Sequence, residues 1–170
     1  KLLKRERINS MLSVIYDYPL TIVEAPMGFG KTTAVRSFLE LNGYDYFWIA
    51  FLNSVEFTSF FGERFAAEID KVDKNVSTRL KSLGFPVDAP QIEKVLSLLN
   101  DIAFHKKTIL VIDDFHLSPD ISINKLLMRI AAEKLDNLHI VIITRDTTNI
   151  DFAELLPKGI CYVLSQQQLK

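Results

Sequence analysis

Five short runs of apolar residues recur along the chain, and a polar turn or loop follows most of them. Positions within each run are nearly all apolar, without the strict alternation of a half-exposed strand. Strands buried on both faces have this character, and they are typical of parallel sheets covered by helices. The pattern therefore predicts an α/β fold with a five-stranded, mainly parallel sheet and helices on both faces. The expected strands are Leu20–Ala25, Asp45–Phe51, Thr108–Ile112, Leu138–Ile143 and Ile160–Leu164.

Between these runs, apolar residues recur at the three- to four-residue spacing of amphipathic helices. In Glu56–Ile69 the phenylalanines have roughly this spacing, and we expect them to lie in the core rather than in a groove for a partner. Asn42-Gly43 is a typical helix stop. The other expected helices are Leu2–Tyr16, Thr33–Leu41, a short one within Lys71–Pro90, Gln91–Phe104, Ile121–Leu135, and a short one closing at Glu154 and Leu155.

A glycine-containing stretch lies between the first expected strand and the helix that follows it: Ala25-Pro26-Met27-Gly28-Phe29-Gly30-Lys31-Thr32-Thr33. It matches the phosphate-binding pattern G-x-x-x-x-G-K-[ST], with Ala25 in place of the first glycine. Glycines let successive backbone N–H groups turn toward an anion, and the helix N-terminus adds partial positive charge. We expect Lys31 to reach the β- and γ-phosphates and the Thr32 hydroxyl to bind Mg²⁺. The alternative is a glycine-rich turn with a solvated lysine.

The third apolar run ends in two adjacent acids, which is typical of the Walker B motif. We expect Asp113 to hold the Mg²⁺ shell through water, alongside Thr32. Asp114 is placed to orient or deprotonate an attacking water. The alternative is that the two acids only begin a turn. His116 follows closely, and a hydrogen-bonded structural histidine is its simpler interpretation.

Arg145 follows the fourth apolar run directly. A guanidinium at the end of that strand could reach a γ-phosphate, distinguish ATP from ADP and stabilise transferring charge. The alternative is a surface arginine paired with Asp146. Right-handed crossovers place the carboxyl ends of parallel strands along one edge of the sheet, where ligands bind. The sequence therefore predicts that Lys31, Asp113 and Arg145 meet at this edge.

Composition narrows the class only slightly. The chain has 170 residues, of which 48% are hydrophobic, enough for one domain with a sizeable core. A net charge of -1 gives no general attraction to nucleic acid or membrane. Cys161 is the one cysteine, so a disulfide within the chain is excluded, and we expect a buried thiol. No zinc spacing, membrane-span length or signal peptide is visible, and a cytoplasmic location is expected.

Taken in order, the three motifs resemble those of the MalT-like group of STAND signal-transduction ATPases, known as LuxR-family ATP-dependent transcriptional regulators. The similarity includes Lys4–Ile8, the loop from Ala25 to Thr33, the segment Val111–His116, and Ile143-Thr144-Arg145. It implies a P-loop NTPase sheet of the additional-strand type, with the strand before Arg145 between the P-loop and Walker B strands. It also implies that Arg5 and Arg7 lie against the base of ATP or ADP, and that the Mg²⁺-ATP form self-associates whereas ADP favours rest.

Two departures from this family limit the resemblance. The acidic stretch that often follows the tryptophan there is replaced by Ile49–Ser54, so a role for it is in doubt. The DNA-binding and inducer-binding parts of such regulators are absent from these residues. We expect one domain, with an N-terminal base-contacting element at 1–18, a core at 19–165, and the start of a linker at 166–170. DNA contact is expected only through the absent domains.

Several functions stay open at this point. The first is an ATPase switch with slow hydrolysis, and the second is a nucleotide-binding module without turnover in isolation. A P-loop kinase would usually carry an arginine-rich lid, which is not evident, and a nucleic-acid motor gains no support from the net charge of -1. An interaction platform like those of immune-type STAND proteins is favoured less than a regulator, because of the paired acids, aromatic residue and histidine at Asp113–His116.

Overall fold

The structure, a computed structural model, describes residues 2–26, 30–52, 56–117, 120–148 and 150–165. Its centre is a five-stranded sheet in which every neighbouring pair of strands is parallel. The order is β2-β3-β4-β1-β5, which confirms the parallel sheet and the position of β4 between β1 and β3. The strands are β1 (Leu20–Glu24), β2 (Asp45–Ala50), β3 (Thr108–Asp113), β4 (Leu138–Thr144) and β5 (Cys161–Leu164).

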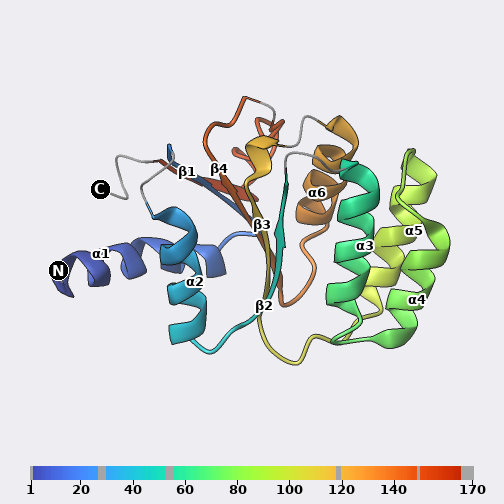
Figure 1. The fold of residues 1–170 in the computed structure, drawn as a ribbon, viewed down its shortest axis with the longest axis horizontal. Coiled ribbons are helices and arrows are strands. Elements are labelled where there is room, and N and C mark those ends of the chain that lie inside the picture. The colour runs from blue at the N-terminus through green and yellow to red at the C-terminus, as the bar shows by residue number, and fades with distance from the viewer. Residues whose placement is uncertain (1, 27–29, 53–55, 118–119, 149, 166–170) are drawn as a thin grey trace.

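Helices cover both faces of the sheet (Figure 1). α1 and α2 lie on one face, α3 and α6 on the other, and α4 and α5 pack beside α3 and α6. The helices are α1 (Leu2–Leu12), α2 (Lys31–Leu41), α3 (Phe57–Ile69), α4 (Lys74–Leu83), α5 (Ala89–Asn100) and α6 (Ile121–Glu133), with 3₁₀ helices η1 (Ser13–Tyr16) and η2 (Phe115–Leu117). None of the helices in this described part has the length and apolarity that crossing a membrane requires.

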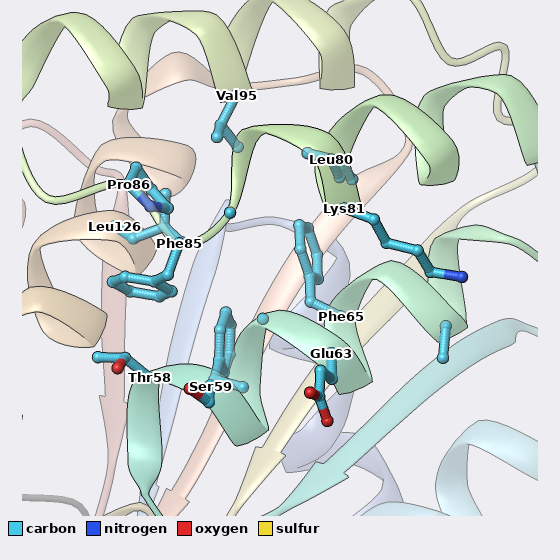
Figure 2. Close-up of a pocket in the computed structure, with 14 residues that line it drawn as sticks. Thr58, Ser59, Glu63, Phe65, Leu80, Lys81, Phe85, Pro86, Val95 and Leu126 are labelled. Atoms are coloured by element: carbon cyan, nitrogen blue, oxygen red, sulfur yellow. The ribbon is translucent and has the colours of Figure 1, made fainter.

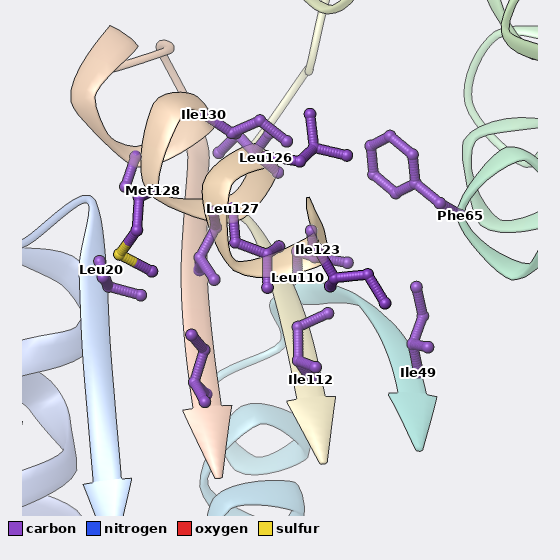
Figure 3. Packing of buried hydrophobic residues seen from close by; sticks show 14 of the residues in the cluster. Leu20, Ile49, Phe65, Leu110, Ile112, Ile123, Leu126, Leu127, Met128 and Ile130 are labelled. Carbon is purple, nitrogen blue, oxygen red and sulfur yellow. The ribbon is translucent and has the colours of Figure 1, made fainter. Parts of the chain in front are cut away.

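Strand β3 shows why the apolar runs lack alternation. Ile109 and Val111 pack into the core beneath α1 and α2, whereas Leu110 and Ile112 pack into the larger core on the other face. Figure 3 shows that second core, in which side chains of α6 lie over the strands. Both faces of the sheet are therefore dry, and an apolar residue is needed at every position. Cys161 is buried as expected, and burial raises its thiol pKa to about 12.

Local polar residues set the ends of the helices on the α3–α5 side. Asp73 accepts a hydrogen bond from the Val76 amide at 3.0 Å, and Asp88 accepts one from the Gln91 amide at 2.9 Å. These side chains satisfy first-turn donors that have no acceptor within the helix. Gly84 ends α4 with φ 70° and ψ -174°, a conformation essentially restricted to glycine.

Four predicted elements differ from the structure. The segment from 153 to 159 forms consecutive turns instead of a short helix, because Pro157 lacks an amide donor. Helix α5 stops at Asn100, so Phe104 lies beyond it. Helix α2 begins at Lys31 and not at Thr33. In the first fifteen residues, the expected single helix changes to 3₁₀ geometry after Leu12.

Candidate functional site

The carboxyl ends of β1, β3 and β4 lie side by side in the sheet, as the topology requires. The Ala25 amide donates to the Thr144 carbonyl at 3.1 Å, which ties the end of β1 to the end of β4. The Phe51 amide donates to the Asp113 carbonyl at 3.1 Å, which ties the segment after β2 to the end of β3. Backbone hydrogen bonds that continue the sheet therefore fix the positions of Ala25 and Asp113.

The described part of the glycine loop has the geometry of an anion-binding helix start. Gly30 has φ 67°, a left-handed conformation that favours glycine, and it immediately precedes α2. The Ala34 amide donates to the Gly30 carbonyl at 2.9 Å, so the amides of Lys31, Thr32 and Thr33 precede the regular helical ladder. Such amides and the helix dipole favour an anion. The predicted loop residues Met27, Gly28 and Phe29 lie outside the described residues.

The predicted pair of magnesium ligands meets directly. Thr32 Oγ1 lies 3.2 Å from Asp113 Oδ1 and 3.1 Å from Asp113 Oδ2, and the hydroxyl donates to the carboxylate. Asp113 is buried. Burial raises the pKa of this carboxyl above its usual value, and the neighbouring Asp114 charge adds to the increase. Two oxygen-bearing side chains from distant parts of the sequence, the predicted magnesium ligands, are thus adjacent in space.

Asp114 has a backbone conformation unusual for a residue with a side chain. Its φ is 54°, in the left-handed region that aspartate tolerates better than most residues. Its amide donates to Asp113 Oδ1 at 2.8 Å, which fixes the turn between the two acids. Strand β3 ends at Asp113, so Asp114 lies in this turn and not in the sheet.

Two cations accompany these acids. Lys31 Nζ donates to the Pro26 carbonyl at 3.5 Å, which is a long hydrogen bond. Desolvation lowers the pKa of Lys31, the charges of Asp113 and Asp114 oppose this change, and Arg145 adds to it. The electrostatic influence of Arg145 on Lys31 is consistent with their expected proximity at this edge of the sheet.

His116 is a site residue that the sequence interpretation undervalued. Its Nδ1 is buried and has no hydrogen-bond partner among the described residues, so the expected structural hydrogen bond is missing at this atom. Desolvation lowers the pKa of His116, and the nearby Arg145 charge lowers it further. A partner supplied by a ligand would satisfy this nitrogen. Its position two residues after Asp114 indicated that it could lie near the site, but nothing in the sequence indicated that its Nδ1 would be unpaired.

The remaining predicted contacts are less localised. Arg5 and Arg7 are exposed on α1, and neither has a hydrogen bond or ion pair within the described chain. Their contact with a nucleotide base stays a prediction. Thr33 is exposed in the first turn of α2, where only its amide has a clear route to an anion.

The residues present fit a magnesium nucleotide better than a free metal ion. Among the described residues, no group of three or more histidine, cysteine, aspartate or glutamate side chains could hold a metal. Magnesium is usually bound by one or two protein oxygens together with substrate phosphates and water. Thr32 and Asp113 supply such a partial set, and Lys31 and the start of α2 supply positive charge for phosphate.

Comparisons with solved structures identify the fold. No protein-family model matches the chain. A chain in a structure of Drosophila ORC bound to AT-rich DNA and Cdc6 has TM-score 0.60 and 11% identity, over 95% of this chain and 53% of that chain. A Walker-type ATPase of Pyrococcus abyssi has TM-score 0.57 and 15% identity, over 96% of this chain and 54% of that chain.

A third similar structure is the Aeropyrum pernix ORC1 protein in complex with DNA. It has TM-score 0.53 and 16% identity, over 96% of this chain and 44% of that chain. This chain therefore spans about half the length of these three solved chains. The structural similarity shows a shared fold, that of the P-loop NTPases, with a five-stranded parallel sheet and flanking helices. At sequence identities this low, the comparison shows the fold alone.

Proposed function

We propose that this chain is an ATP-binding module whose bound nucleotide requires Mg²⁺. The observation that carries the proposal is the contact between the Thr32 hydroxyl and the Asp113 carboxylate, at 3.1 and 3.2 Å. These two residues come from the phosphate-loop motif and the Walker B motif, and they meet beside Lys31. This is the partial ligand set that a magnesium ion completes with phosphate oxygens.

Binding would use the start of α2 and the loop before it. Ala25, Pro26, Met27, Gly28, Phe29 and Gly30 would surround the phosphates, with the amides of Lys31, Thr32 and Thr33. Lys31 would pair with β- and γ-oxygens, since among the described residues its hydrogen-bond acceptor is the Pro26 carbonyl, at the long distance of 3.5 Å. Arg5 and Arg7 would lie against the base. Thr32 and Asp113 would hold Mg²⁺, which neutralises phosphate charge when bound.

Turnover would be slow and would depend on Asp114. Asp114 follows the proposed Mg²⁺ ligand Asp113 directly, in a left-handed turn with φ 54°. Asp114 is therefore the candidate to orient an attacking water and accept its proton. Lys31 and Arg145 would stabilise charge on the transferring phosphate. Arg145 would also report the difference between ATP and ADP.

The wider role we propose is that of a switch in a transcriptional regulator. The resemblance to MalT-like STAND ATPases supports this choice, with ATP favouring self-association and ADP favouring the resting form. Residues 1–18 would contribute the base contact, 19–165 the core, and 166–170 the start of a linker. Because the net charge is -1, DNA contact is assigned to further domains. This assignment is compatible with a cytoplasmic protein, and the similar ORC and ORC1 structures contain DNA.

The nucleotide assignment is tested by titrating a fluorescent ATP analogue with Mg²⁺ against the wild type and Lys31→Ala. We expect affinity to fall about 30-fold, because a charge-assisted hydrogen bond contributes about 2 kcal/mol. Lys94→Ala, at an exposed position of α5, is the matched control and should bind like the wild type. Equal affinity of wild type and Lys31→Ala would remove Lys31 from the site.

A further inference from the structure

A pocket lies on the other side of the molecule from α2, among the helices between β2 and β3. It has a volume of about 640 Å³, and α3, α4 and the loop after α4 form its walls. Figure 2 shows Phe65 and Phe85 at these walls, and Val95 of α5 and Leu126 of α6 also line the pocket. Pockets of 300–1,000 Å³ are the usual size for small organic ligands.

Two glycines, Gly62 and Gly84, are part of the wall of this pocket. Gly84, with φ 70° and ψ -174°, turns the chain after α4 so that Phe85 lies edge-on to Phe61, with ring centroids 6.2 Å apart at 85°. Gly62 lies on α3, where a Cβ would meet Phe85 at an ordinary contact distance of 4.0 Å. Gly62 and Phe85 both line the pocket, so a side chain longer than alanine at Gly62 would reach Phe85 and crowd this wall.

The lining indicates what kind of ligand fits. The phenyl groups of Phe61 and Phe65 are stacked with centroids 5.7 Å apart, so the pocket offers both ring faces and ring edges to another aromatic group. Glu63 and Lys81 contribute opposite charges to the lining, and neither has a recorded ion pair within the described residues. Their charges offset each other, which favours an uncharged molecule. The Ser59 hydroxyl could bond to one polar substituent.

A series of aromatic rings in contact connects the pocket to Asp113 and Asp114. Phe61 stacks with Phe51 at 6.3 Å and 15°, and Phe51 meets Phe115 at 6.1 Å and 71°. The Phe51 amide also donates to the Asp113 carbonyl at 3.1 Å. Phe115 directly follows Asp114 in the sequence. A shift of Phe61 would therefore reach the turn that carries both acids through one intermediate residue.

We propose that this pocket is an effector site for an uncharged, flat aromatic molecule with one polar substituent, and that its occupancy alters the Asp113–Asp114 turn. The ligand site stands independently of the nucleotide assignment, whereas its effect on ATP affinity rests on the function proposed above. The pocket walls support the ligand site, and the ring contacts support its effect on the turn. Each of these two claims is tested by its own measurement.

The ligand site is tested with 1-aminoanthracene, an uncharged aromatic probe whose fluorescence rises in apolar surroundings. We expect saturable binding to the wild type and at least tenfold weaker binding to Gly62→Leu, which fills the pocket. Gly62→Ala fits the helix and should retain binding, and Ser97→Leu adds the same side chain at an exposed position of α5. Thermal unfolding verifies that each variant is folded. No saturable binding to wild type and Gly62→Ala, or equal binding by folded Gly62→Leu, would overturn the site.

The coupling is tested by hydrogen exchange of the backbone amides at 111–117, with and without saturating 1-aminoanthracene. We expect at least a threefold change in exchange rate, lost in Phe51→Leu although the probe still binds. An unchanged rate in the probe-bound wild type would overturn the coupling. The affinity for Mg²⁺-ATP is measured in parallel, and we expect at least a threefold change on probe binding. If the protein binds no nucleotide, the proposed function fails, while fluorescence and exchange still decide the effector site.

Discussion

Two buried carboxyl groups in this molecule have opposite surroundings. Glu68 on α3 is 5% exposed, and Asp113 at the end of β3 is 4% exposed. Glu68 forms ion pairs with Arg64, at 3.2 Å, and with Lys71. Asp113 instead accepts bonds from the Thr32 hydroxyl and the Asp114 amide, and its sequence neighbour is another acid.

The difference separates a structural acid from a ligand-binding acid. A buried charge is costly unless opposite charges or hydrogen bonds compensate it. Arg64 and Lys71 of the chain itself compensate the charge of Glu68, so this acid does not require a bound cation. The hydrogen-bond donors to Asp113 that the described residues supply, the Thr32 hydroxyl and the Asp114 amide, are neutral. Burial raises its pKa, and the charge of Lys31 opposes this only in part. A cation that arrives with the ligand would supply what the fold leaves out.

The largest expected effect is on magnesium-dependent nucleotide binding. Asp113→Asn should weaken ATP affinity in the presence of Mg²⁺ about 30-fold, because a charged ligand worth about 2 kcal/mol is lost. Glu68→Gln should leave this affinity unchanged. Isothermal titration with and without Mg²⁺ measures both. Similar losses in the two variants would show that Asp113 has no special relation to the metal.

A smaller effect is expected for the cations that accompany each acid. Arg145→Ala should reduce the preference for ATP over ADP about tenfold, equivalent to about 1.4 kcal/mol, if its guanidinium contacts the γ-phosphate. Arg64→Ala removes a guanidinium beside Glu68 and should leave the preference unchanged. Competition of ATP and ADP against one fluorescent nucleotide gives the ratio. An unchanged ratio in Arg145→Ala would end its assignment as a sensor.

In the absence of nucleotide and metal, the same acids should affect stability with opposite signs. Asp113→Asn should raise the free energy of unfolding by about 1 kcal/mol, since a poorly compensated buried charge is removed. Glu68→Gln should lower it by about 1 kcal/mol through the loss of two ion pairs whose basic partners are exposed. Urea unfolding at neutral pH measures both, with Asp136→Asn as the exposed control.

The sign for Asp113 follows from its raised pKa. The folded state holds the Asp113 proton more tightly than the unfolded state, so stability falls as pH rises from the unfolded value through the folded one. The penalty is therefore greatest at pH values above the folded-state pKa. Destabilisation by Asp113→Asn would therefore contradict the view that its charge lacks compensation.

The smallest expected effect tests a half-buried titratable group, His139, away from the acids. Desolvation lowers the pKa of His139, although its Nδ1 lies 2.8 Å from the Tyr18 carbonyl. The unfolded state then binds the proton more readily, so stability should be complete above about pH 6.5 and fall on acidification. Urea unfolding from pH 8 to pH 5 should show a weaker decline in His139→Gln. His105→Gln, at an exposed position, should decline like the wild type.

Much of this architecture could be predicted because its causes are local. The uninterrupted apolar run at Thr108–Ile112 predicts a strand buried on both faces, and the structure confirms it. The parallel arrangement then brings Thr32 to Asp113, a contact that the motifs predict without any contribution from the loop's central residues. The position of β4 between β1 and β3 came from the family resemblance and is also confirmed.

Other features depend on distant contacts that sequence spacing does not contain. Phe51 ends an apolar strand like any core residue, and nothing in its neighbours indicates the contact with Phe115. The unpaired Nδ1 of His116 results from packing around the site. The pocket wall brings Gly62 of α3 against Phe85 in the loop after α4, a distant contact, so the phenylalanine pattern of α3 indicated core packing alone.

The strand order also sets when the site can exist during synthesis. Leu20 of β1 pairs with Ile140 of β4 and with Cys161 of β5, so the first strand made finds its neighbours last. β3 meets β1 only through β4, because β4 lies between them. When β3 but not β4 has emerged from the ribosome, the nascent chain contains both Thr32 and Asp113. It still lacks the strand that joins β1 to β3 in the sheet. Ribosome-bound chains should acquire nucleotide binding only after β4 emerges, which makes the ligand a late reporter of folding.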